Sequence, residues 1–219
     1  MRPLLLGHRG SRCLRSVREN TFEAFELALQ HGCDGFEFDV RLSSDRVAVV
    51  CHDAKFRRLS ISKTVASRLQ ELPSLEAVLQ RYGTRAFLDI ELKVPGTEIQ
   101  LLGLLARCPP RKGFVVSSFL PAVLLELRRL DTTTPLALIC ENGRQLRRWR
   151  ELPIEYVIVH YSLASRRLIK ETREAGKKLF IWTVNRPAAM LRFAGWGADG
   201  LITGQTDLLA KTFPGPREL

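Results

Sequence analysis

Two carboxylates lie two residues apart within a strongly apolar segment. Glu37 and Asp39 alternate with the apolar residues Phe36, Phe38 and Val40. This spacing places both acidic side chains on one face of a β-strand. If the two carboxylates are buried together, they repel each other and their pKa values rise, unless a cation lies between them. The pattern therefore favours a cation site over a solvent-exposed strand face.

A second segment repeats this arrangement. In residues 87–93, the side chains of Asp89, Glu91 and Lys93 fall on one side of a strand. Carboxylates from two neighbouring strands form a hard oxygen site of the kind that binds magnesium or calcium. Lys93 lies one alternation beyond Glu91, where its ammonium group could meet a substrate anion.

Two histidines end apolar segments elsewhere in the chain. His8 ends residues 4–8, and His52 ends residues 47–52. A lone histidine is more often a structural residue than a catalyst, but two histidines near one carboxylate cluster indicate chemistry. An imidazole pair supplies a base and an acid near neutral pH, which phosphodiester transfer requires.

The elements that must position these residues alternate along the chain. Helical spacing of apolar residues predicts helices at Thr21–Gln30, Pro121–Leu130 and Ser165–Ala175. Asn20, Ser74 and Ser165 are the expected helix caps, and Gly32, Gly83 and Gly176 the expected helix ends. Short apolar segments predict nine strands: Leu4–His8, Gly35–Val40, Val47–His52, Ala86–Glu91, Phe114–Ser118, Pro135–Cys140, Tyr156–His160, Lys178–Val184 and Gly200–Thr203.

This alternation predicts an α/β fold with a parallel sheet covered by helices. The six residues between Val40 and Val47 are too few for a parallel crossover, so Val47–His52 is expected to fold back as a hairpin. The eight remaining strands can close a (β/α)8 TIM barrel, with the hairpin as an excursion after the second strand. With a turn near position 44 or 45, His52 is expected beside Glu37. No long linker interrupts the chain, so residues 1–219 are predicted to form one domain.

The candidate residues occur within seven short motifs, whose order and context resemble those of the glycerophosphodiester phosphodiesterase family. The motifs are His8-Arg9-Gly10, Glu19-Asn20-Thr21, Glu37-x-Asp39-Val40, His52-Asp53, Glu91-x-Lys93, Ser117-Ser118-Phe119 and Trp182-Thr183-Val184-Asn185. The resemblance runs from Leu4 to about Thr203, which is nearly the whole chain. It implies a variant (β/α)8 barrel that uses a divalent metal, magnesium or calcium, to hydrolyse small glycerophosphodiesters to glycerol 3-phosphate and an alcohol.

The resemblance also implies how this chain would bind a metal and a phosphate. Glu37, Asp39 and Glu91 match the metal ligands of the family, and Arg9 and Lys93 match its phosphate contacts. Positive charge at these positions would offset the charge that develops on phosphorus in the transition state.

By the same resemblance, His8 and His52 match the catalytic histidine pair, and Trp182 matches an aromatic floor in the pocket. Asp53 follows His52 and is expected to orient its imidazole. The glycerol hydroxyl of the substrate is expected to attack phosphorus and form a cyclic phosphate, which water then opens. Chain order suggests His8 as the base and His52 as the acid, although the residues alone leave this assignment open.

Three departures from the family pattern concern the substrate-covering region and the last strand. Phe56-Arg57-Arg58-Leu59-Ser60 stands where many relatives have Leu-x-Arg-Thr-Thr, and the insertion at this place is short, at residues 54–73. The last strand ends in Thr203-Gly204-Gln205, where relatives often have Thr-Asp. The preferred leaving alcohol therefore stays open.

Composition limits the remaining possibilities. With 45% hydrophobic and 26% charged residues, the 219-residue chain is not disordered, fibrous or a disulfide-rich miniature. No segment approaches the ~20 apolar residues that span a bilayer. The first apolar stretch, Leu4–Leu6, is shorter than the roughly 7–15 residues of a signal peptide. Five scattered cysteines without a C-x-x-C pair indicate reduced thiols, so the cytoplasm is the expected compartment.

The chain is basic, with 34 Lys and Arg residues against 23 Asp and Glu residues and a net charge of +11. Because these residues are spread along the whole sequence and no nucleic-acid-binding motif accompanies them, we expect neither a nucleic-acid partner nor stable membrane insertion. The oligomeric state stays open.

Two other functions fit parts of the pattern. A phospholipase D-like lyase that acts on intact phospholipid would use the same metal and histidine layout. Its lipid contact would involve the basic loop 54–59, which contains the apolar residues Phe56 and Leu59. A non-catalytic basic barrel that binds anions would need the acidic residues and both histidines to be coincidental.

Overall fold

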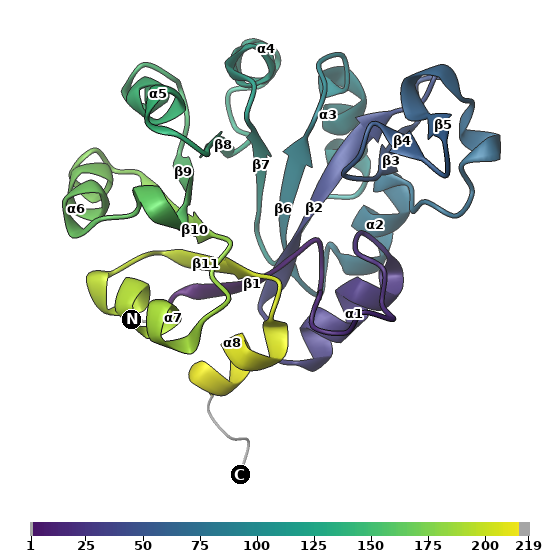
Figure 1. Ribbon diagram of the computed structural model, residues 1–219. Helices are drawn as coiled ribbons and strands as arrows, with labels where there is room; N and C mark the ends of the chain where they lie inside the picture. Colours follow the sequence, from purple (N-terminus) through teal and green to yellow (C-terminus); the bar gives the residue numbers. More distant parts are fainter. Residues whose placement is uncertain (1, 215–219) are drawn as a thin grey trace.

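Eight of the nine predicted strands run parallel and close into a barrel. The computed structural model describes residues 2–214, and β2 pairs with both β1 and β6, so the sheet has no break around the barrel. The predicted (β/α)8 fold is confirmed (Figure 1). The barrel strands are β1 (Leu4–His8), β2 (Gly35–Leu42), β6 (Phe87–Leu92), β7 (Phe114–Ser118), β8 (Leu136–Cys140), β9 (Tyr156–His160), β10 (Lys178–Trp182) and β11 (Gly200–Thr203).

Helices surround the barrel on the outside (Figure 1). They pack their apolar faces against outward-facing strand residues, which together form the largest buried cluster. The α-helices are α1 (Phe22–Gln30), α2 (Leu75–Tyr82), α3 (Glu98–Arg107), α4 (Pro121–Leu130), α5 (Gly143–Leu146), α6 (Arg166–Glu174), α7 (Pro187–Trp196) and α8 (Thr206–Thr212). Short 3-10 helices η3 (Arg147–Arg150) and η4 (Tyr161–Leu163) lie in two of the connections.

The helix caps agree with the sequence at two of three positions. The hydroxyl oxygens of Ser74 and Ser165 accept hydrogen bonds from the first turns of α2 and α6, as predicted. The prediction that Asn20 caps a helix is wrong, because Thr21 caps α1. Asn20 adopts a left-handed conformation (φ +59°), and its side chain points to β2 instead.

The predicted hairpin exists, with a shorter second strand and a register shifted by one residue. β3 spans Ala48–Val50 and pairs antiparallel with β2, Val40 opposite Val50. Ser43 and Val47 close a three-residue loop in which Arg46 is left-handed (φ +63°). This loop is centred on Asp45, so opposite residues sum to 90. The predicted pairing of His52 with Glu37 is therefore wrong, and His52 lies beyond the end of the ladder.

The segment after β3 forms an arm over the carboxyl end of the barrel. We define the arm as residues 51–73; it contains β4 (Lys55–Phe56), β5 (Leu59–Ser60), η1 (Ile61–Lys63) and η2 (Ala66–Arg68). Val49, Ile61, Leu69 and Leu72 form a small buried cluster of their own beneath it. β3 joins the two cores, because Ala48 and Val50 face the main one.

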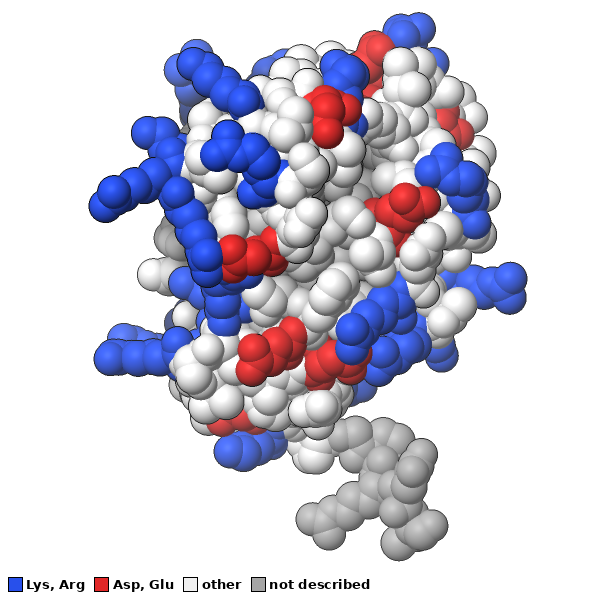
Figure 2. Space-filling view, turned by 90° about the vertical axis from the view of Figure 1, so that its right-hand side faces the viewer, with Lys and Arg blue, Asp and Glu red and all other residues white. Residues whose placement is uncertain are grey.

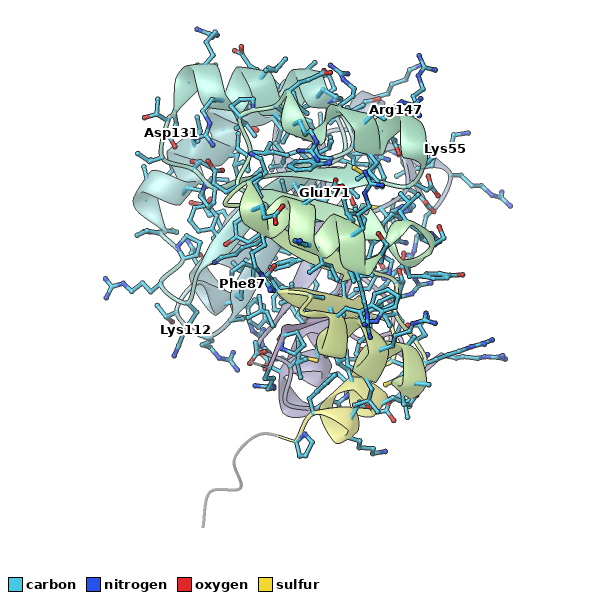
Figure 3. All side chains as sticks on the ribbon, turned by 90° about the vertical axis from the view of Figure 1, so that its left-hand side faces the viewer. Lys55, Phe87, Lys112, Asp131, Arg147 and Glu171 are labelled. Carbon is cyan, nitrogen blue, oxygen red and sulfur yellow. The ribbon has the colours of Figure 1, made fainter. Side chains whose placement is uncertain are left out.

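The barrel interior changes character along its length. Near the amino ends of the strands it is filled by apolar residues such as Leu6, Phe87 and Phe180. Figure 3 shows Phe87 and Lys112 at this end of the molecule, and Lys55 and Arg147 at the opposite, carboxyl end. Toward the carboxyl end, β1, β2, β6 and β7 turn polar side chains inward, whereas β8, β9 and β11 contribute isoleucines.

Basic residues are spread over the surface, as they are along the sequence. Figure 2 shows Lys and Arg side chains on all sides of the visible face, mostly toward its edges, with acidic side chains among them and a largely uncharged centre. Within residues 2–214, none of the helices combines the length and apolar character needed to cross a membrane.

The close packing of β2 against β6 can be tested by substitution of Gly35. A Cβ added at Gly35 would lie 1.9 Å from the backbone oxygen of Phe87. Gly35→Ala should therefore lower the free energy of unfolding by about 2–3 kcal/mol, as overpacking does. At Gly103, in α3, a Cβ would approach only the end of Arg107, at 3.7 Å. Gly103→Ala should raise stability by about 0.5–1 kcal/mol. Urea unfolding followed by circular dichroism measures both, and equal stability of the two variants would contradict this packing.

Candidate active site

The predicted site residues meet at the carboxyl end of the barrel. A cavity of about 450 Å³ opens there and is lined by seven of the nine predicted residues: His8, Arg9, Glu37, His52, Glu91, Lys93 and Trp182. Asp39 lies beneath this surface with no exposed area, and Asp53 lies outside the cavity, against His52. Asp89 also lines the cavity.

Strand register brings the carboxylates together. In the β2–β6 ladder, Glu37 lies beside Asp89 and Asp39 beside Glu91. Each side chain points into the barrel because inward-facing positions alternate along a strand. Oxygens of Glu37, Asp39 and Glu91 lie within 4.8 Å of one another, and all three residues are buried.

Burial and mutual repulsion raise the pKa values of most of these carboxyl groups. Burial, followed by the charge of Asp39, raises the pKa of Glu37 well above its usual value and that of Glu91 to about 7. Burial also raises the pKa of Asp89 to about 7, although Ser117 donates a hydrogen bond to it at 2.6 Å. Asp39 differs: burial opposes its ionisation, but nearby Lys93 and Arg9 hold its pKa below the usual value.

Two cations partly neutralise the cluster. The Lys93 ammonium lies 3.2 Å from Asp39 Oδ1 and 2.7 Å from Glu91 Oε1. The Arg9 guanidinium lies 3.3 Å from Asp39 Oδ2. Arg9 has a left-handed backbone (φ +57°), and its amide donates a hydrogen bond to Glu37 Oε2 at 2.9 Å. Both residues also line the cavity, where their charges face an incoming anion.

The remaining oxygens suit a divalent metal. Among the residues that the structure describes, Glu37 Oε1 and Asp89 Oδ2 are buried without a hydrogen-bond partner. A buried carboxylate oxygen without a partner is costly, and a cation would satisfy it. The donor set consists of carboxylate oxygens, which are the preferred ligands of magnesium and calcium. The geometry therefore fits a metal held by Glu37, Asp39 and Glu91.

The two histidines approach the cavity from different elements. His8 ends β1, with Nε2 3.8 Å from Glu37 Oε2 and Nδ1 3.4 Å from the Thr183 hydroxyl. Burial, assisted by the charge of Arg9, lowers the pKa of His8 to about 3, so its imidazole is neutral. His52 comes from the start of the arm and is partly exposed. Its Nδ1 lies 2.8 Å from Asp53 Oδ1, which leaves Nε2 for the substrate.

An aromatic wall faces the carboxylates across the cavity. The Trp182 ring lies 6.1 Å from the His8 ring and 5.8 Å from Phe119, measured between ring centroids. Ile139, Ile158 and Ile202 line the same half. One side of the cavity is thus strongly charged and the other is mostly apolar, with Glu141 and Gln145 after β8 as its polar residues. This suits a ligand with a phosphate at one end and a carbon skeleton at the other.

Supporting residues that the sequence did not identify hold this arrangement. The Asn20 side-chain amide donates to Asp39 Oδ2 at 2.8 Å, and its oxygen accepts from the Asp39 amide at 3.3 Å. Glu19 holds Arg9 at 2.8 Å and Arg12 at 3.0 Å. The Glu19-Asn20-Thr21 motif is the sequence feature that could have identified both residues, but Asn20 was interpreted as a helix cap.

The pKa of Glu37 predicts a pH-dependent effect on stability. Because folding raises this pKa, the wild type loses stability as pH increases from about 4.5 through the folded-state value, by up to about 1.4 kcal/mol per pH unit for one group. Glu37→Gln removes this penalty and keeps an acceptor for the Arg9 amide. In excess chelator, Glu37→Gln should therefore be more stable than the wild type, by a margin that grows from pH 5 to 7.5. Chemical unfolding at several pH values measures this margin, and a constant difference would contradict the assignment.

Comparison with known proteins gives a consistent result. The model of the glycerophosphoryl diester phosphodiesterase family matches residues 8–98 and 108–208. A glycerophosphodiester phosphodiesterase of Caldanaerobacter subterraneus subsp. tengcongensis is 27% identical over 237 aligned positions, which cover 95% of this chain and 97% of the relative.

Solved structures of similar proteins have the same fold. A glycerophosphodiester phosphodiesterase from Thermotoga maritima superimposes with a TM-score of 0.80 and 25% identity, and the match covers 96% of this chain and 98% of that one. A phosphodiesterase from Oleispira antarctica, in complex with the product sn-glycerol-3-phosphate, superimposes with a TM-score of 0.85 and 22% identity, over 97% of both chains.

Proposed function

The chain belongs to the glycerophosphoryl diester phosphodiesterase family and is a phosphoric diester hydrolase, and on this premise we propose how it acts. It hydrolyses glycerophosphodiesters to glycerol 3-phosphate and an alcohol, with a divalent cation, magnesium or calcium, held by Glu37, Asp39 and Glu91. The observation that carries the proposal is the cavity in which this carboxylate cluster, two histidines and two cations converge. The Oleispira phosphodiesterase, whose structure holds the product sn-glycerol-3-phosphate, supports a small-molecule substrate.

The charged half of the cavity binds the phosphate. When bound, the metal supplies Lewis acidity and offsets negative charge on the phosphoryl oxygens. Lys93 and Arg9 add two positive charges on the same side, and they are held there by Asp39, Glu91 and Glu19. Because these contacts exist before substrate arrives, little reorganisation is needed when charge develops in the transition state.

The apolar half positions the glycerol. Trp182 and the isoleucines of β8, β9 and β11 exclude water from one side of the bound molecule. The Trp182 indole Nε1 is buried without a hydrogen-bond partner in the described part of the chain, so it can donate to a glycerol oxygen. This orients the glycerol hydroxyl toward phosphorus, and proximity of that kind supplies much of the rate.

The histidines move the protons. His8 Nε2 removes the proton from the attacking glycerol hydroxyl, and the new O–P bond forms a cyclic phosphate. His52 Nε2 gives a proton to the leaving alcohol as its O–P bond breaks, and Asp53 holds the tautomer that this requires. Water then opens the ring with the two roles reversed, which returns both histidines to their starting states.

The cytoplasm stays the predicted compartment of this chain. All five cysteines are free thiols, as a reducing compartment requires. The roles proposed for the metal ligands and for the two histidines can be tested separately.

Metal removal provides the first test. Excess chelator should abolish release of glycerol 3-phosphate, and magnesium or calcium should restore it, because the substrate phosphate would otherwise meet a cluster of carboxylates. Glu91→Gln should raise the metal concentration needed for half-maximal activity. The metal should also raise the melting temperature of the wild type more than that of Glu91→Gln. Full activity after exhaustive dialysis against chelator would refute metal dependence.

Separate substitution of the histidines provides the second test. His8→Ala and His52→Ala should each lower kcat by about 10²–10⁴, the usual contribution of a positioned acid or base. Both variants should keep the melting-temperature increase that the metal causes, because neither residue is a proposed ligand. His31→Ala is the control, since His31 follows α1 and does not line the cavity. A near-normal rate in His52→Ala would show that His52 is not the general acid.

A further inference from the structure

A second cavity lies directly behind His52. It has a volume of about 300 Å³ and is bordered by residues 18–20, the start of the arm and Leu72. His52 lines both this cavity and the larger one that contains the carboxylates. The two cavities therefore adjoin at His52.

The charges around this second cavity are not balanced. Its acidic residues already have partners, because Glu19 pairs with Arg9 and Arg12, and Asp53 lies against His52. Arg57 pairs with Glu71. Arg18 and Lys55 differ from these, since within the described residues neither has a carboxylate oxygen within 4.0 Å.

Arg18 is also held in place. Its guanidinium lies 5.1 Å from the centroid of the Phe56 ring and donates a hydrogen bond to the backbone oxygen of Glu71 at 3.0 Å. Phe56, Val50 and Leu72 give the cavity an apolar wall. The site therefore presents two uncompensated positive charges beside a surface that a carbon skeleton can contact.

We propose that this second cavity binds the leaving alcohol and that Arg18 and Lys55 select glycerophosphodiesters whose alcohol carries an anionic group, such as a phosphate monoester. The inference rests on the proposed function. With glycerol 3-phosphate in the larger cavity, the leaving oxygen lies at His52, and the rest of the alcohol extends to the far side of that imidazole. A cationic head group would be disfavoured there, because it would meet Arg18 and Lys55.

A matched pair of substrates tests the inference. Glycerophosphoinositol 4-phosphate and glycerophosphoinositol differ only by the monoester on the leaving alcohol. The wild type should use the phosphorylated substrate with a kcat/KM about fivefold higher, as expected for two exposed charge contacts. Arg18→Gln and Lys55→Gln should each lower this ratio, and the double variant should bring it close to one.

Lys63→Gln is the matched control, because it removes one positive charge from the arm outside this cavity. It should leave the ratio and the activity unchanged. A ratio near one in the wild type, an unchanged ratio in the double variant, or an equal loss in Lys63→Gln would overturn the subsite. In each of these cases the proposed function still stands, because both diesters are hydrolysed. Absence of turnover with both of these diesters would overturn the inference. The proposed function would be overturned only if diesters with neutral and cationic alcohols also released no glycerol 3-phosphate.

Discussion

Four buried carboxyl groups at one end of the barrel interior impose the constraint on which the rest of the site depends. Glu37, Asp39, Asp89 and Glu91 are neighbours because β2 and β6 pair in parallel with inward-facing positions in register. Their charges cannot coexist in a low-dielectric interior without compensation. Lys93, the residue after β6, supplies part of this compensation, and the turn after β1 supplies the rest through Arg9. A metal-binding centre is the arrangement that this excess of negative charge favours.

The same constraint explains why the opposite half of the cavity is apolar. With the polar side chains concentrated on β1, β2, β6 and β7, the strands from β8 to β11 are free to contribute bulky apolar residues such as Ile139 and Trp182. Most of the charge therefore lies on the side of the proposed phosphate site, although Glu141 after β8 also lines the cavity. The low polarity of the other side strengthens the electrostatic contacts. The division follows strand order around the barrel, so it is a property of the topology as well as of individual residues.

The sequence predicted the barrel because period-two alternation and short connections leave few ways to arrange eight strands. Strand alternation and pairing also predicted that Glu37 and Asp39 meet acidic side chains of a neighbouring strand, and the family resemblance selected Glu91 as the third member of the set. The sequence did not predict the position of His52 correctly, because hairpin register depends on whether one residue of the loop, here Arg46, adopts a left-handed conformation. The role of Asn20 was also predicted wrongly, because the sequence does not distinguish an asparagine that caps a helix from one whose amide binds a buried carboxylate.

The arm has a consequence for how the protein would lose activity. Because Val49, Ile61, Leu69 and Leu72 form a cluster separate from the main core, the arm can open locally at a lower free-energy cost than the barrel can unfold. His52 lies at the start of the arm, just beyond the last pair of the ladder between β2 and β3. It follows that mild heating or low denaturant would displace the proposed general acid, His52, while the barrel remains intact. Inactivation would then precede the loss of secondary structure and would reverse on cooling, so the thermal limit of activity would be set by the 23 residues of the arm, 51–73, and not by the fold as a whole.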